Sequence, residues 1–134
     1  MRQNGYNKLK SLVRWLDVEN TLLAKILERN YMQHRRQPFL LYTRLALKHS
    51  AQFAKRLKSN VKSLHSDSAC DLEEINELSD KCTALIIRAG VELSRIHVHR
   101  HFTQLITTLI ACLSRLHLLM GKWRKSSFHK LKAK

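Results

Sequence analysis

Residues 28–42 read ERNYMQHRRQPFLLY, and this stretch decides how the first half of the chain folds. It contains Pro38, the only proline among 134 residues. Because proline has a fixed φ and no N–H group, it breaks the interior of a helix but is well accepted as the first residue of one. The stretch therefore predicts a connector between two helices, with Pro38 as the first residue of the second.

The same connector is rich in side chains that hold phosphates and unpaired bases. Cations, amides and aromatic rings follow one another closely: Arg29, Asn30, Gln33, His34, Arg35, Arg36 and Phe39, beside Tyr31 and Tyr42. Arginine holds phosphates or stacks on rings, whereas an amide both donates to and accepts from base edges. These residues are the main candidates for RNA contact. The alternative is structural, since Asn30, Gln33 and His34 can satisfy backbone groups at the helix ends.

Helical periodicity extends in both directions from this connector. Before it, apolar residues recur at spacings of three, four or seven, which predicts one helix from near Tyr6 to about Arg29. After it, a second helix is predicted from Pro38 to about Leu64, with its cations on one face. That face forms a predicted basic ridge of Arg44, Lys48, Lys55, Lys58 and Lys62. Such a ridge binds a phosphate backbone, or it is simply a solvated helix face.

The second half of the chain predicts two further helices. A polar connector at residues 65–70 precedes Asp71, which has the position of an N-cap, with Glu74 three residues later as in a capping box. Gly90 lies inside this third helix and is expected to allow a close helix crossing. A break near residues 97–101 separates the last helix.

The last predicted helix and the tail complete the fold class. The apolar seam of residues 102–120 alternates spacings of four and three, as in a helix bundle, and Gly121 is the predicted C-cap. The sequence thus predicts an all-α fold, a bundle of about four long antiparallel helices in residues 1–121. Residues 122–134 are predicted to form a basic tail, in which Trp123 and Phe128 stack on bases or bind a partner.

The charge of the chain favours a polyanionic partner. Lys and Arg total 25 against 10 Asp and Glu, which gives a formal net charge of +15. A field of this size attracts nucleic acid or an anionic membrane surface. Membrane binding needs an exposed apolar face, but the apolar stripes of these helices are needed for the core. The most apolar window, residues 102–120, is interrupted by polar and charged side chains and is a poor transmembrane candidate.

No catalytic or metal-binding pattern emerges from the sequence. The three cysteines are widely spaced and form no CxxC pair, which fits a reducing compartment and buried thiols. Histidines at 97, 99 and 101 place at most two side chains on one helix face, short of the four ligands that zinc prefers. No Gly-rich phosphate loop is present. We therefore expect no cofactor, no metal and no small-molecule substrate.

The connector also resembles the signature of a known family. Arg29, Asn30, Gln33, His34 and Arg35 agree in identity, and Phe39 in aromatic type, with the pattern R-N-K-N-Q-H-R-x-x-x-W of the protein subunit specific to ribonuclease MRP, a helical family related to the nucleolar Nepro proteins. Tyr31 and Met32 depart from the Lys-Asn pair, and Leu40 stands where a second aromatic residue is usual. The run FTQLITTLIACLSRLHLLM at residues 102–120 resembles the family's C-terminal helix.

The resemblance implies a non-catalytic subunit of an RNA-based endoribonuclease. In such an enzyme the RNA carries the chemistry, and the substrate is precursor ribosomal RNA. The implied partners are the MRP RNA and the protein subunits shared by RNase P and RNase MRP, and the implied location is the nucleolus. No membrane is implied. Two other classes stay open, namely a DNA- or chromatin-binding helical protein and a helical adaptor that docks proteins through its acidic segment and tail.

Overall fold

The computed structural model describes the backbone of residues 2–62, 70–97 and 103–125, and the side chains of residues 7–59, 73–96 and 104–125. Its helices are α1 (Arg2–His34), α2 (Pro38–Lys62), α3 (Cys70–His97) and α4 (Thr103–Lys125). No strand occurs within these ranges. The predicted all-α bundle of about four helices is therefore confirmed.

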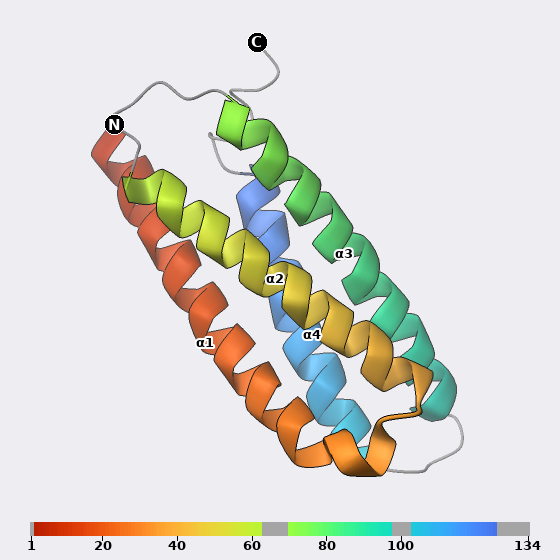
Figure 1. Cartoon of the computed structure of the whole chain (residues 1–134). Helices are drawn as coiled ribbons and strands as arrows, with labels where there is room; N and C mark the ends of the chain where they lie inside the picture. Colours follow the sequence, from red (N-terminus) through yellow and green to blue (C-terminus); the bar gives the residue numbers. More distant parts are fainter. Residues whose placement is uncertain (1, 63–69, 98–102, 126–134) are drawn as a thin grey trace.

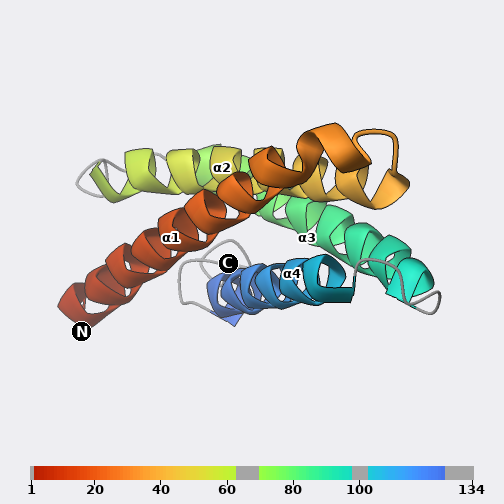
Figure 2. The ribbon, with the colours of Figure 1, turned by 90° about the horizontal axis from the view of Figure 1, so that it is seen from below.

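The helices run alternately down and up the long axis of the molecule (Figure 1). α1 packs against α2 and α4, and α3 packs against the same two helices, so the four helices close into a ring. Seen from below, α2 and α4 lie on opposite sides of the bundle (Figure 2). The turn between α1 and α2 lies at the same end of the bundle as the end of α3 and the start of α4 (Figure 1).

Each helix contributes one apolar face to a single core. In α1 the apolar face includes Leu9, Leu12, Leu16 and Leu23, which are all buried. Asn20 is buried among them, and its Oδ1 accepts a 2.7 Å hydrogen bond from Ser50 Oγ in α2. A buried leucine stabilises a fold by about 1.5–3 kcal/mol, so this stripe keeps α1 continuous from Arg2 to His34. The single first helix is confirmed, and it extends past the predicted end at Arg29.

Three local predictions are wrong. α3 begins at Cys70, so Asp71 lies in its first turn rather than at the N-cap. α4 continues through Gly121 to Lys125, so Gly121 is no C-cap and the boundary predicted after it falls inside a helix. Gly90 does not lie at a close helix crossing, because a Cβ added to it meets no atom within 4 Å.

Candidate nucleic-acid interface

The turn between α1 and α2 has the predicted local structure. α1 ends at His34, whose carbonyl accepts a 2.9 Å hydrogen bond from the N–H of Gln37. The Gln37 carbonyl in turn accepts a 3.1 Å bond from the N–H of Leu40, at the start of α2. Pro38 is the first residue of α2, where a missing N–H group loses no helical hydrogen bond. The proline therefore sets the corner of the bundle, as predicted.

Three of the predicted RNA-binding residues are part of the bundle instead. Phe39 and His34 expose only 1% and 3% of their surfaces, and their ring centroids lie 5.6 Å apart with the planes at 52°. Asn30 Nδ2 donates a 2.8 Å hydrogen bond to the carbonyl of Ile26 in the same helix. A ring as buried as Phe39 offers no face to a base, the His34 ring beside it is also enclosed, and the Asn30 amide is held by its own helix.

The other predicted contact residues lie on the surface. Exposed side chains are those of Arg29, Gln33, Arg35, Arg36, Arg44, Lys48 and Lys55. None of the six cations in this group forms an ion pair with any side chain that the structure describes. We call these six residues the unpaired cation set. The side chain of Lys62 lies outside the described residues.

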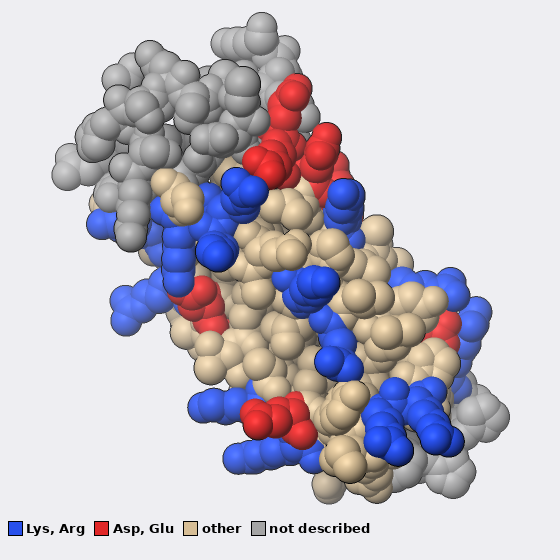
Figure 3. Space-filling view, viewed as in Figure 1, with Lys and Arg blue, Asp and Glu red and all other residues tan. Residues whose placement is uncertain are grey.

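Carboxylates of the described helices pair with other cations. The bridges join Lys58 with Asp17, Arg56 with Glu74 (3.1 Å), Arg115 with Glu19 (2.7 Å), Arg124 with Asp80 (3.0 Å), and both Arg88 (3.6 Å) and Arg95 (3.2 Å) with Glu92. Lys58 therefore differs from its neighbours on the predicted ridge, because its charge is offset within the fold. On the face drawn in Figure 3, the largest group of acids lies over the start of α3, away from the turn.

A contact that the sequence does not reveal joins α1 to α2 beside the turn. The guanidinium carbon of Arg44 lies 4.7 Å from the centroid of the Tyr31 ring, within range of a cation–π interaction. The pair borders an open hollow of about 450 Å³ between the two helices. Tyr31 and Arg44 belong to different helices, so no local spacing indicates that they touch. The only sequence signal is that each lies within a stretch of predicted contact residues.

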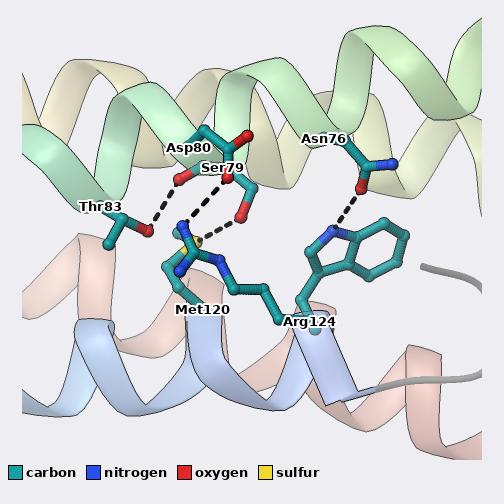
Figure 4. Close-up of polar contacts among 7 residues, drawn as sticks. Asn76, Ser79, Asp80, Thr83, Met120 and Arg124 are labelled. Atoms are coloured by element: carbon teal, nitrogen blue, oxygen red, sulfur yellow. Dashed lines mark hydrogen bonds and ion pairs between the residues drawn. The ribbon is translucent and has the colours of Figure 1, made fainter. Parts of the chain in front are cut away.

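Trp123 is a core residue rather than a tail residue. It is 1% exposed, its indole N–H donates a 3.1 Å hydrogen bond to Asn76 Oδ1 in α3 (Figure 4), and its ring meets Phe53 edge-on at 5.8 Å. The prediction that Trp123 stacks on bases or binds a partner is therefore wrong. Burying this large ring outweighs the cost of about 1 kcal/mol for carrying Gly121 inside α4. Phe128 lies outside the described residues.

The buried thiols are poorly suited to nucleophilic chemistry. Cys82 and Cys112 are free and buried. Burial raises the pKa of Cys82 to about 12, although a side-chain hydrogen bond with Ser50 opposes the shift, and burial also raises the pKa of Cys112. A thiol that stays protonated is a weak nucleophile. Across the described ranges, no group of three His, Cys, Asp or Glu side chains is placed to hold a metal ion, and the side chains of histidines 97, 99 and 101 lie outside those ranges.

α4 is the most apolar helix of the described chain. Its segment Gln104–Lys125 has a mean hydropathy of 1.3 and is long enough to cross a membrane. In the bundle, however, its seam of Ile106, Leu109 and Leu116 is buried against the other helices. A core helix passes the same test of length and composition, so these features do not establish a membrane span.

Comparisons with known proteins identify no relative of this chain. The chain matches no protein-family model, no curated protein and no solved structure. In this chain, unpaired cations surround the α1–α2 turn and continue along α2.

Proposed function

We propose that this protein is a non-catalytic, RNA-binding subunit of the ribonuclease MRP ribonucleoprotein, acting in precursor rRNA processing and ribosome biogenesis in the nucleolus. The resemblance of residues 29–39 to the signature of the MRP-specific subunit supports the identity of the complex. The exposed cations of the α1–α2 corner support RNA as the ligand. The protein binds and shapes the MRP RNA, and the RNA supplies the chemistry.

The observation that carries RNA binding is the division between paired and unpaired cations. Five carboxylates of the described helices, on Asp17, Glu19, Glu74, Asp80 and Glu92, are bound to cations outside the unpaired cation set. The unpaired cation set keeps its attraction for phosphate, because no internal carboxylate has to be displaced when RNA binds. Each phosphate that it neutralises releases counterions, which makes the affinity depend on salt.

The spacing of the unpaired cation set suits a polynucleotide backbone. Arg35 and Arg36 lie in the turn at one end of the bundle, and the other cations continue from it along α1 and α2. A rise of about 1.5 Å per residue places Arg44 and Lys48 about 6 Å apart along α2, close to the step between neighbouring phosphates. A strand that follows this part of α2 therefore meets Arg44 and Lys48 at neighbouring phosphates, and the step from Lys48 to Lys55, about 10 Å, spans more than one phosphate.

Protein subunits shared by RNase P and RNase MRP are the proposed second class of partner. The acids at the start of α3 lie at the opposite end of the bundle from the α1–α2 turn (Figure 3). Glu73 and Glu77 are exposed there, while Glu74 and Asp80 already hold Arg56 and Arg124. Basic segments of neighbouring proteins would find carboxylates at this end without competing for the cations that bind RNA.

The test compares two double variants that remove the same charge from opposite ends of the bundle. Arg35→Gln/Arg36→Gln changes the turn, and Lys122→Gln/Lys125→Gln changes exposed cations near the end of α4. Binding of the endogenous RNA, tRNA and duplex DNA is measured by fluorescence anisotropy between about 50 and 200 mM salt. Thermal midpoints confirm that both variants are folded.

We expect the turn variant to lose RNA affinity and to reduce the slope of log K against log salt by about 1.4, near 0.7 for each phosphate contact with a single strand. The α4 variant should change that slope by much less. Equal effects of the two variants would show that net charge, rather than the α1–α2 corner, governs binding. If the protein enriches no structured RNA over tRNA and duplex DNA, the MRP assignment fails.

A further inference from the structure

The open hollow between α1 and α2 is lined by both apolar and polar side chains. Its volume of about 450 Å³ lies within the range of about 300–1,000 Å³ that is usual for small-ligand sites. The apolar lining comes from Ala24, Leu27, Leu47 and Ala51, and the polar lining comes from Glu28, Tyr31, Arg44 and Lys48. An apolar lining with a few polar groups suits a flat heterocycle.

Small side chains leave this space open. Ala24 and Ala51 lie on facing sides of α1 and α2, one turn or more from the Tyr31–Arg44 contact. Alanine fills little of the gap between two helices, and the buried Leu27 and half-buried Leu47 complete the apolar lining. The hollow is therefore lined by apolar side chains of both helices together with the Tyr31–Arg44 pair.

The polar groups of the hollow are available to a ligand. Arg44 places its planar guanidinium over the Tyr31 ring, and such a stack extends naturally to a third flat group. Lys48 lies one helical turn beyond Arg44. Glu28 and Lys48 form no ion pair with any described side chain, although both line the same hollow.

A carboxylate distinguishes the four bases by the hydrogen-bond donors that each base offers. Guanine presents two adjacent donors on its Watson–Crick edge, N1–H and the N2 amino group, which match the two oxygens of a carboxylate. Uracil offers a single N3–H flanked by two acceptors, and adenine and cytosine each place an acceptor next to the amino group. Glu28 therefore favours guanine, while the neighbouring cations offset the repulsion between Glu28 and phosphate.

We propose that this hollow binds one unpaired guanine of the RNA, stacked on the Arg44–Tyr31 pair, with its Watson–Crick edge on Glu28 and its phosphate on Lys48. This inference rests on the proposed RNA-binding function. It adds recognition of one base to a surface that would otherwise bind only phosphates. It assigns Tyr31 a direct part in the site, at a position where the chain departs from the MRP-subunit signature.

The test uses the full chain and labelled single-stranded pentamers of uridine, whose central residue is guanosine, uridine, adenosine or an abasic ribose. Binding is measured by fluorescence anisotropy at one low salt concentration. The wild-type protein should bind the guanosine pentamer about tenfold more tightly than the uridine pentamer, as for one bidentate contact. The abasic pentamer should bind no more tightly than the uridine pentamer.

Three variants separate base recognition from charge. Glu28→Gln should abolish the guanosine preference without weakening binding of the uridine pentamer, because it also removes a repulsive charge. Glu77→Gln removes the same charge from exposed α3 and should leave the preference intact. Arg44→Lys keeps the charge but loses the planar stack, so the affinity for guanosine should fall towards that of the abasic pentamer.

Each outcome decides the proposal. Base recognition is overturned if the guanosine preference survives Glu28→Gln, if all pentamers bind the wild type equally, or if no pentamer binds although structured RNA does. Each of these results leaves RNA binding through phosphates in place. If no pentamer binds and structured RNA also fails to bind, the proposed function itself falls. Circular dichroism and thermal melting show whether each variant is folded, and Arg44→Lys tests the site independently of Glu28.

Discussion

Gly90 is the residue at which helix propensity can be isolated most cleanly. It lies inside α3, and a Cβ added to it would meet no atom within 4 Å. We therefore expect Gly90→Ala to raise the free energy of unfolding by about 0.5–1 kcal/mol, because alanine loses less backbone entropy on forming a helix. Urea unfolding followed by circular dichroism measures this change. A loss of stability would mean that the space next to Gly90 is filled in solution.

Cys82 gives the fold a dependence on alkaline pH. Burial raises the pKa of the Cys82 thiol from its ordinary value of 9.0 to about 12. Between these values the thiol of the unfolded chain ionises while the folded thiol stays protonated, so the unfolded state binds fewer protons. The contribution of Cys82 to stability is therefore complete below pH 9 and is lost as the pH rises towards 12, by up to about 1.4 kcal/mol per pH unit.

The measurement is the difference in unfolding free energy between the wild type and Cys82→Ala at several pH values above neutrality. Lysine and tyrosine also titrate in alkali, and the difference cancels their contribution. The wild-type advantage should shrink as the pH rises, while Cys82→Ala follows a shallower curve. Parallel curves for the two proteins would show that the Cys82 thiol ionises as easily in the folded as in the unfolded chain.

The last turn of α4 is an element whose stability depends on tertiary contact. The two tryptophans offer a matched test, since Trp123 is 1% exposed and Trp15 is 58% exposed. Trp123→Ala should lower the free energy of unfolding by about 3–5 kcal/mol, because it leaves a cavity and removes the donor to Asn76. Trp15→Ala should change it by no more than about 0.5 kcal/mol.

Denaturant unfolding of the two single variants provides the comparison. In addition, acrylamide should quench Trp15 fluorescence in the folded protein and leave Trp123 fluorescence largely unquenched. Similar destabilisation by both substitutions would place the α4 end outside the core. The α4 helix would then end near Gly121, as its sequence suggests.

At the scale of the whole molecule, excess positive charge opposes folding. The net charge of +15 leaves many cations without a partner, and their mutual repulsion is greatest in the compact state. We expect the thermal midpoint to rise when sodium chloride increases from about 10 mM to 150 mM, because the Debye length falls from about 30 Å to 8 Å. The exposed ion pairs weaken over the same range, but each contributes at most about 1 kcal/mol.

Differential scanning fluorimetry at constant pH measures this shift. Arg35→Gln/Arg36→Gln should show a smaller rise than the wild type, because two unpaired charges of the corner are gone. A midpoint that falls with salt would mean that ion pairs such as Arg115–Glu19 outweigh the general repulsion.

The sequence by itself determined the all-α class, the approximate number of helices and the corner at Pro38. These features follow from periodicity and covalent geometry, which act over a few neighbouring residues. It also set the basic character of α2, since Arg44, Lys48 and Lys55 fall on one helix face without any tertiary contact. Helix ends were less determined, because burial of a single ring, Trp123, extends α4 beyond the glycine that suggested a stop.

Only the tertiary structure decided which of the candidate residues remain available to a ligand. It buries His34 and Phe39 and offsets Lys58 with Asp17. It also brings Arg44 over Tyr31 from a different helix. Burial, ion pairing and ring stacking depend on which helix faces meet, and those faces are brought together by packing of the whole bundle. The sequence therefore determines which chemical groups are present near the turn. The packing of α1 against α2 determines which of these groups stay exposed to a ligand.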